Sequence, residues 1–110
     1  MTSENNEIPQ SQGEACCEYK TLVGVFKALS DESRQKILLT LEEEGEMRVS
    51  GLVKKLDISQ PTISHHLGVL KNAGLVEDRR QGQSIFYRVN RGWLAECCND
   101  FISRFEEEDD

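Results

Sequence analysis

The chain has 110 residues, of which 37% are hydrophobic and 30% charged, so we expect a single domain with a modest core, a size that often gains stability by dimerising. It has no run of 18 apolar residues, which excludes a membrane-spanning helix, and its polar start lacks the hydrophobic stretch of a signal peptide. We therefore expect a cytoplasmic protein, in which the four cysteines are thiols, metal ligands or redox sensors rather than structural disulfides.

The net charge of −7 is unevenly distributed along the chain. Residues 47–91 hold eight basic and three acidic side chains, a net charge of +5, whereas the remainder holds five basic and seventeen acidic ones, a net charge of −12. Because phosphate binding follows the local field, the middle of the chain is the candidate nucleic-acid surface. The acidic ends would lower non-specific affinity, so this pattern predicts a salt-sensitive, selective binder rather than a general DNA coat.

The N-terminal third predicts a disordered tail followed by two helices. Residues 1–14 are rich in Glu, Asn, Gln and Ser, which is typical of disorder. A first helix is predicted from about Ala15 to Leu29, and Ser30 or Asp31 would cap a second helix that ends at a left-handed Gly45. The apolar positions expected to face inward are Leu22, Val25, Phe26, Leu29, Ile37, Leu38 and Leu41.

The stretch from Leu52 to Leu75 is the centre of the sequence, because it predicts a short helix, a tight turn and a second helix. The Ser59 hydroxyl is expected to accept a backbone N–H at the start of the second helix. Pro61 lies in the first turn, where its missing donor costs little. The side chains at Ile63, Leu67 and Leu70 recur at i, i+4 and i+7 and form one narrow buried stripe.

The opposite side of this second helix is almost uncharged. A helix that faces only water usually carries Glu and Lys there, whereas short hydrogen-bonding groups and a glycine suit a helix in the DNA major groove. The alternative is an ordinary packing corner. The centre of this side consists of Pro61, Ser64, His65, Gly68 and Asn72; the DNA-contacting residues that we predict on the helix are Gln60, Thr62, Ser64, His65 and Lys71.

Two β-prone runs follow, Leu75 to Arg79 and Ser84 to Val89, and Gly82 supplies the turn between them. The segment 47–49 is a candidate for a very short additional strand. A hairpin directly after a recognition helix is a wing, and we predict that Arg79, Arg80 and Gln83 near its tip contact phosphates or the adjacent minor groove. The alternative for the two arginines is a solvated surface.

The last helix is predicted from about Arg91 to Phe105, and residues 106–110 form an acidic tail. Its apolar band is wider than a core of this size can cover, which predicts a homodimer interface. The band consists of Trp93, Leu94, Cys97, Cys98, Phe101, Ile102 and Phe105. Residues 15–105 would thus form one DNA-binding and dimerisation domain.

Several segments together resemble one known family. They are Phe26–Asp31 with Arg34 and Ile37-Leu38, Ser59–Leu67, Leu70 with Ala73–Val76, and Arg80–Gly82 with Tyr87. They resemble the ArsR/SmtB family of bacterial and archaeal winged-helix repressors, and the run Ser-Gln-Pro-Thr-Ile-Ser-His-His-Leu is the most specific match. The resemblance implies a mainly α winged helix-turn-helix with a small β-hairpin, and a homodimer through the N- and C-terminal helices. It also implies a palindromic double-stranded operator and repression that ends when an inducer binds.

Two inducer sites of that family are missing from this sequence. Where the thiolate sensors have Cys-Val-Cys, this chain has Arg48-Val49-Ser50. The zinc site on the terminal helix needs Asp, His and Glu at helical spacing, and the segment 90–105 does not supply them. We interpret His65 as facing DNA and His66 as structural.

The remaining candidates are two adjacent pairs of cysteines, Cys16-Cys17 and Cys97-Cys98, on the two helices expected at the dimer interface. Thiolates select thiophilic ions, and arsenite prefers three sulfurs. Neighbouring helical residues diverge by about 100°, so Cys97 and Cys98 can share one ion only if the helix distorts. We predict a thiophilic inducer, arsenite first, that joins both pairs, and no cofactor for folding. Simple packing of Cys97 and Cys98, and oxidation or persulfide sensing, remain alternatives.

Two other classes of function, a protein-interaction module and an enzyme, are compared with the repressor. A winged helix can act only as a protein-interaction module, although that role would not require a neutral polar helix face and an arginine-rich hairpin. An enzyme is not expected, because the sequence contains no nucleophile–base set, phosphate-binding loop or Cys-x-x-Cys motif.

Overall fold

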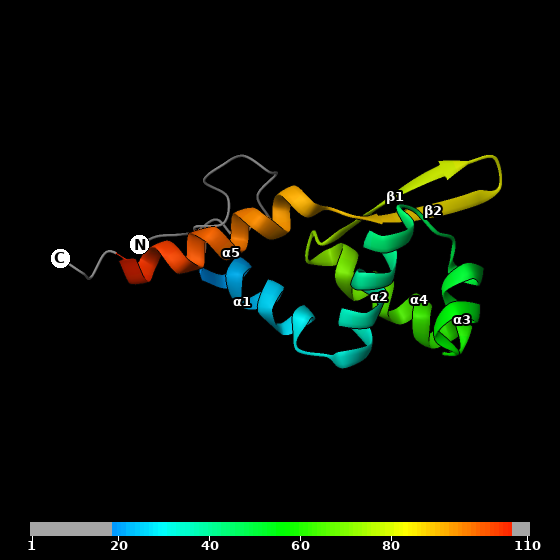
Figure 1. Cartoon of the computed structure of the whole chain (residues 1–110), viewed down its shortest axis with the longest axis horizontal. Coiled ribbons are helices and arrows are strands. Elements are labelled where there is room, and N and C mark those ends of the chain that lie inside the picture. Colours follow the sequence, from blue (N-terminus) through cyan, green and yellow to red (C-terminus); the bar gives the residue numbers. More distant parts are fainter. Residues whose placement is uncertain (1–18, 107–110) are drawn as a thin grey trace.

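The computed structural model describes residues 19–106, and within them it contains five helices and one two-stranded sheet (Figure 1). The elements are α1 (Tyr19–Leu29), α2 (Glu32–Glu44), α3 (Val49–Leu56), α4 (Gln60–Asn72), β1 (Val76–Gln81), β2 (Ser84–Val89) and α5 (Arg91–Glu106). The predicted mainly α fold with a β-hairpin is confirmed. The predicted N-terminal tail, the first helix before Tyr19, and the end of the acidic tail lie outside the described residues.

The two ends of α2 are set by the residues expected there. The Asp31 carboxylate accepts the backbone N–H of Arg34 at 3.1 Å, and this bond is the main reason that the pKa of Asp31 is lowered. At the other end Gly45 has φ 93° and donates its N–H to the Leu41 carbonyl at 2.7 Å. The positive φ is as expected, but ψ of −61° lies outside the left-handed helical region, so that detail of the prediction was wrong.

The start of α4 differs from the expectation in one bond. Ser59 is the N-cap residue and Pro61 lies in the first turn, as predicted. However, the Ser59 hydroxyl donates to Thr62 Oγ1 at 3.0 Å and makes no cap bond to a backbone N–H. Because serine and threonine hydroxyls can each donate or accept, two of them three residues apart can satisfy one another instead of the backbone.

The core contains buried apolar side chains from all five described helices. On α4 the predicted stripe is buried, with exposed fractions of 0% for Ile63, 1% for Leu67 and 0% for Leu70. Burying such a side chain contributes about 1.5–3 kcal/mol, so this stripe fixes which side of α4 remains outside. It packs with Leu22, Val25, Ala28, Ile37, Leu38, Leu41, Leu52, Leu75, Val76, Trp93 and Cys97.

The hairpin is tighter than the sequence suggested. The two strands pair from Val76 opposite Val89 to Gln81 opposite Ser84, so only Gly82 and Gln83 form the turn. Gly82 has φ +65°, which glycine adopts without steric cost. The expected short strand at 47–49 is reduced to one bridge, in which Met47 and Tyr87 exchange backbone hydrogen bonds of 3.1 and 2.8 Å.

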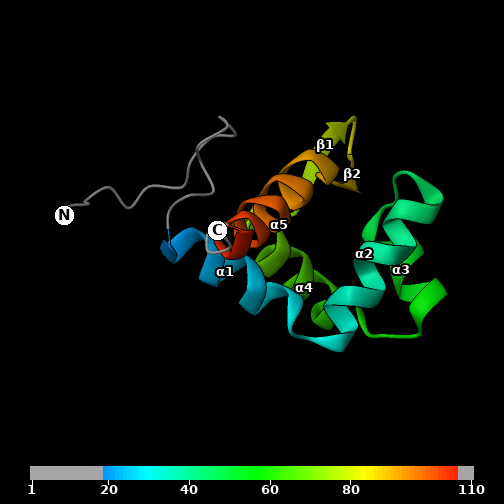
Figure 2. The same ribbon diagram turned by 60° about the vertical axis from the view of Figure 1, so that its left-hand side comes forward.

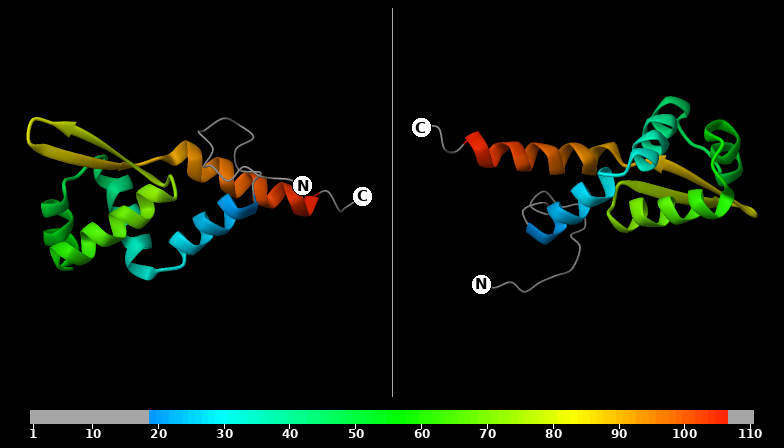
Figure 3. Two further views of the ribbon diagram at one scale, coloured as in Figure 1. Left: turned by 180° about the vertical axis from the view of Figure 1, so that it is seen from behind. Right: turned by 90° about the horizontal axis from the view of Figure 1, so that it is seen from below.

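The helices α1 and α5 lie side by side at one end of the molecule, and α3 and the hairpin turn lie at the other (Figures 1 and 3). The rings of Phe26 on α1 and Phe101 on α5 make an edge contact with centroids 4.9 Å apart. Turned by 60°, the molecule shows α4 between α1 and α3 (Figure 2). No helix in residues 19–106 has the length and apolarity needed to cross a membrane.

The junction between α4 and α5 is closely packed. The Trp93 indole N–H donates to the Ala73 carbonyl at 3.0 Å, and the Trp93 backbone N–H donates to Asn90 Oδ1 at 3.1 Å. Gly74, the residue after Ala73, has φ +81°, and a Cβ there would lie 2.8 Å from Trp93 Nε1. This position therefore requires glycine for both its backbone angle and its space.

Candidate nucleic-acid interface

The uncharged side of α4 is fully on the surface. The exposed residues include all those predicted to read DNA on this helix and its central Pro61, Gly68 and Asn72; the predicted contacts are Gln60, Thr62, Ser64, His65 and Lys71. At Gly68 an added Cβ would meet no atom within 4 Å, so nothing inside the described part of the protein requires a glycine there. The missing side chain instead leaves the backbone of α4 accessible to an external partner.

The two adjacent histidines have opposite environments. His65 is exposed, whereas His66 is 9% exposed and its Nδ1 lies 3.3 Å from Nη1 of Arg34 on α2. Burial lowers the pKa of His66 below its ordinary value of 6.5. His66 thus packs inside, as expected, and His65 belongs to the outer face of α4.

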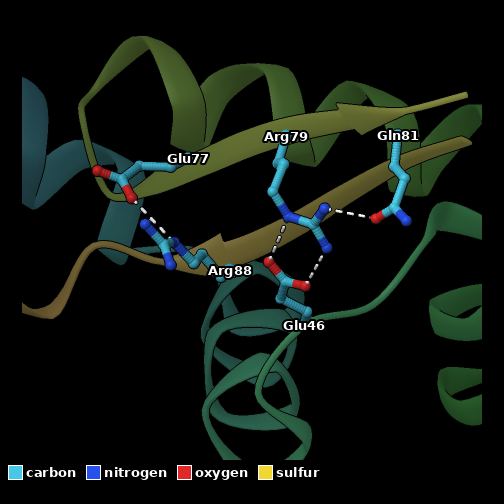
Figure 4. Close-up of polar contacts among 5 residues, drawn as sticks. All are labelled: Glu46, Glu77, Arg79, Gln81 and Arg88. Atoms are coloured by element: carbon cyan, nitrogen blue, oxygen red, sulfur yellow. Dashed lines mark hydrogen bonds and ion pairs between the residues drawn. The ribbon is translucent and has the colours of Figure 1, made fainter.

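Arg79, in the middle of β1, is held by the carboxylate of Glu46 in the connection between α2 and α3 (Figure 4). Its Nε and Nη2 donate to the two oxygens of Glu46 at 3.1 and 2.7 Å, and its Nη1 donates to Gln81 Oε1 at 2.6 Å. The hydrogen bond between the two groups lowers the pKa of Glu46 and raises that of Arg79. The sequence placed Arg79 near the tip, but β1 continues to Gln81, so Arg79 lies within the strand.

Phe86 on β2 contacts two arginines that are distant in the sequence. The guanidinium carbon of Arg79 lies 5.0 Å from the centroid of the Phe86 ring, and that of Arg48 lies 5.9 Å from it. Arg48 also donates to Ser84 Oγ at 3.5 Å. A cleft of about 320 Å³ opens beside this cluster, lined by Glu46, Met47, Arg48, Ser50, Gly51, Lys54 and Phe86.

The basic side chains near this surface fall into two groups. Lys71 binds Asp78 at 2.8 Å, Lys55 binds Glu44 at 3.0 Å and Arg88 binds Glu77 at 3.1 Å, so each of these charges is matched by an acid. The hydrogen bond that Lys71 donates to the Asp78 carboxylate raises the pKa of Lys71. Within residues 19–106, no ion pair is formed by Arg48, Lys54 or Arg80. Gln83 is exposed in the hairpin turn.

The cysteine pair on α5 is divided between the core and the surface. Cys97 is fully buried in the core, while Cys98 is half-buried and lines a groove of about 620 Å³ between α2 and α5. The groove is mostly apolar, with Leu38, Leu39, Val89 and Leu94 among its walls. Cys16 and Cys17 lie outside the described residues, and the part of the chain that is described contains no group of three or more His, Cys, Asp or Glu suited to hold a metal ion.

Comparison with known proteins gives consistent matches. Residues 31–78 match a family described as bacterial regulatory protein, arsR family, and this segment spans α2 to the start of β1. The chain is 42% identical over 83 residues to the transcriptional repressor SdpR of Bacillus subtilis (strain 168), covering 73% of this chain and 91% of that protein. It is 47% identical over 81 residues to the arsenical resistance operon repressor of Escherichia coli (strain K12), covering 71% and 69% of the two chains.

A solved structure also matches in fold. The ArsR-like transcriptional regulator from Rhodococcus sp. RHA1 superposes with a TM-score of 0.77 at 35% sequence identity, covering 83% of this chain and 85% of that one. The fold of this chain is therefore also found in another regulator of this type.

Proposed function

This chain belongs to the ArsR family of DNA-binding transcriptional repressors rather than to a family of enzymes, and from this premise we propose that it binds a palindromic operator as a homodimer and leaves it when a thiophilic ion binds. In each protomer α4 enters the major groove and the hairpin lies over the adjacent backbone or minor groove. The observation that carries the proposal is the exposed, nearly uncharged face of α4 around Gly68.

We assign base contacts to the first two turns of this face. Gln60 and His65 have donors and acceptors that match base edges, and the hydroxyls of Thr62 and Ser64 can bond to any base. Gly68 lets the helix backbone approach closely. Sequence preference would therefore come from the segment 60–65.

Phosphate contacts are assigned according to which cations already have an acidic partner. Arg80 on the hairpin and Lys54 on α3 form no ion pair among the described residues, so we propose both as phosphate contacts. Lys71 and Arg79 can bind phosphate only by exchanging a carboxylate for it. For Gln83, which is exposed in the hairpin turn, we propose a contact in the minor groove.

The homodimer is proposed from apolar surface that the monomer leaves uncovered. On α5 the exposed fractions are 52% for Ile102 and 63% for Phe105, and on the neighbouring α1 Tyr19 is 71% exposed. Two adjacent helices with such side chains form a patch that a second copy of the chain would bury. The two copies of α4 would then meet two half-sites of one operator.

The inducer proposed is arsenite or another thiophilic ion, bound by thiolates of Cys16, Cys17, Cys97 and Cys98. Similarity to a protein named as an arsenical resistance operon repressor supports this choice, as does the half-buried thiol of Cys98 beside a groove. Because Cys97 is buried, α5 must distort if Cys97 and Cys98 are to bind the same ion. Such a distortion would couple ion binding to the proposed dimer interface. Such coupling is typically about 1–3 kcal/mol.

The test has two steps. The full-length protein is titrated, by fluorescence anisotropy at several salt concentrations, against DNA from upstream of its own gene; a sequence-selective, salt-sensitive complex is expected, and its absence would favour a protein-interaction module. Arsenite, antimonite, lead, cadmium and zinc are then added to the reduced complex.

The cysteine variants decide how release occurs. Cys16→Ser, Cys17→Ser, Cys97→Ser and Cys98→Ser are compared with Ala95→Ser, which adds a hydroxyl to the same groove without removing a thiol. Loss of release in one or more cysteine variants is expected. Normal release in all four overturns the thiolate site, and release by peroxide or persulfide alone would favour the redox alternative.

A further inference from the structure

Arg34 on α2 contacts two other helices, α1 and α4, through one side chain. From the first turn of α2, its Nε donates to the Ala28 carbonyl at 2.8 Å and its Nη2 to the Lys27 carbonyl at 3.3 Å, both at the end of α1. Its Nη1 lies 3.3 Å from His66 Nδ1, in the middle of α4. The helix that carries the exposed DNA-reading face is thus joined to the helix expected at the dimer interface.

The chemistry of this contact fixes the state of His66. A guanidinium only donates hydrogen bonds, so His66 Nδ1 must accept, and the ring must be neutral with its proton on Nε2. A second proton would place an N–H against the N–H of Arg34 and one positive charge beside another. The hydrogen bond can therefore form only while His66 is neutral.

The surroundings of His66 favour that neutral state. Burial is the largest influence, and the charges of Arg34 and His65 act in the same direction; Asp31 on α2 is the acid that opposes them. The carbonyls of Lys27 and Ala28 hold the Arg34 cation in place beside the ring. The net effect is a pKa of His66 below 6.5.

We propose that the Arg34–His66 hydrogen bond is a proton-sensitive link that holds the recognition helix α4 against α1, so that protonation of His66 releases α4 and weakens operator binding. Arg34 is then a positioning residue, which acts on DNA only through α4. This inference rests on the proposed operator binding.

The acid response has to be assigned to His66, and the other histidine of the chain, His65, lies beside it on the exposed outer face of α4. Protonation of His66 weakens binding. The Arg34–His66 hydrogen bond is intact above the ordinary His66 pKa of 6.5, and it is lost as the pH falls through the lowered pKa that His66 has in the folded protein. The experiment therefore uses His65→Gln as its background.

Operator affinity of the full-length His65→Gln protein is measured by anisotropy between about pH 5 and 8 at constant ionic strength. Affinity is expected to fall about fivefold or more on acidification. Adding His66→Asn, whose amide oxygen lies near the place of Nδ1 and accepts at every pH, is expected to flatten the profile. Adding His66→Phe, which cannot accept, is expected to weaken binding across the whole range.

Nitrogen NMR of the imidazoles in the free protein supplies a readout that is independent of DNA. The expected result is an Nε2–H tautomer for His66 and a pKa that rises in Arg34→Met, with melting curves to show that each variant folds. A proton on Nδ1 at neutral pH, or an unchanged acid response in His66→Asn, overturns the link while operator binding survives. Absence of binding by every protein at every pH rejects the proposed function itself, and the inference with it.

Discussion

Glu46 and Arg79 are 33 residues apart in the chain, and they form a two-bond ion pair with N···O distances of 3.1 and 2.7 Å (Figure 4). The pair joins the connection between α2 and α3 to strand β1. Together with the backbone bridge between Met47 and Tyr87, it fixes the angle at which the hairpin leaves the domain. An arginine held in this way has a structural task in addition to any contact with DNA.

The first prediction compares two adjacent arginines. Arg80→Gln should lower the slope of log K against log salt by about 0.9, because a phosphate contact that displaces a condensed counterion is lost. Arg79→Gln should change the slope less, since Arg79 already has the Glu46 carboxylate as its counter-charge. The measurement is operator anisotropy at four or more salt concentrations.

Glu46→Gln is the matched control for that comparison. It keeps the size of the side chain and frees the charge of Arg79, so the salt slope should become steeper by about the contribution of one phosphate contact. Equal slopes for the Arg79 and Arg80 variants would contradict the assignment of these two arginines to different roles.

The second prediction concerns two glycines. Gly68→Ala should stabilise the fold by about 0.5–1 kcal/mol, because alanine is the better helix residue and its methyl group meets nothing within the described part of the protein. The same methyl should weaken operator binding on the order of tenfold, the scale of one lost base contact. Denaturant titration and anisotropy measure the two effects separately.

Gly74→Ala should behave in the opposite way with respect to folding. A positive φ costs an L-residue about 1–2 kcal/mol, and the added Cβ would collide with the Trp93 indole. A loss of more than about 2 kcal/mol in the free energy of unfolding is expected. Gly74→Ala at wild-type stability would show that the junction between α4 and α5 can relax.

The third prediction is a loss of stability in mild acid. The pKa of His66 is lowered in the folded protein, so the unfolded chain takes up the proton first. The contribution of His66 to the free energy of unfolding should be fully present above about pH 6.5. It should decrease as the pH falls from there through the lowered pKa that His66 has in the folded protein. Denaturation midpoints across this range provide the measurement.

Acidic groups with lowered pKa values lose their contributions to stability at a lower pH than His66 does. The carboxyls of Asp31 and Glu46 have pKa values lowered from 3.8 and 4.5, so their contributions disappear only in stronger acid. His66→Asn should remove the decrease near neutrality and leave the stronger-acid decrease intact. A wild-type decrease that persists in this variant would assign it to another group.

The fourth prediction tests the uncovered patch on α5. Ile102→Glu should shift the protein from dimer to monomer in light scattering after gel filtration, because it places a charge among the exposed apolar side chains. Ser103→Glu adds the same charge one residue later and, at about 100° per residue, on a different side of the helix. It should leave the dimer intact. Dissociation by both variants would indicate a general effect of charge.

Local patterns were enough to predict most of the architecture. The stripe of Ile63, Leu67 and Leu70 fixed the buried side of α4, and therefore its exposed side, because a helix has a single apolar stripe to bury. Asp31 and Gly45 similarly marked the ends of α2. These features depend on residues a few positions apart, so a sequence read in order can identify them.

The remaining features depend on contacts between distant residues or on competition between equal partners. Nothing in the sequence near Arg79 indicates that Glu46 lies opposite its guanidinium, nor that Arg34 reaches His66 on another helix. Ser59 had two acceptable partners, and the Thr62 hydroxyl rather than a backbone N–H is the one it bonds. The hairpin turn was predicted too long because Arg80 and Gln81 have polar side chains, although their backbone pairs with Ile85 and Ser84.

Trp93 is the only tryptophan in the chain, and from the first turn of α5 its indole donates to the carbonyl of Ala73, the residue that caps the end of α4. Its fluorescence therefore arises where the start of α5 is bonded to the end of α4. An inducer or an operator duplex can accordingly be followed by the emission of the unlabelled protein, with no dye attached near either surface.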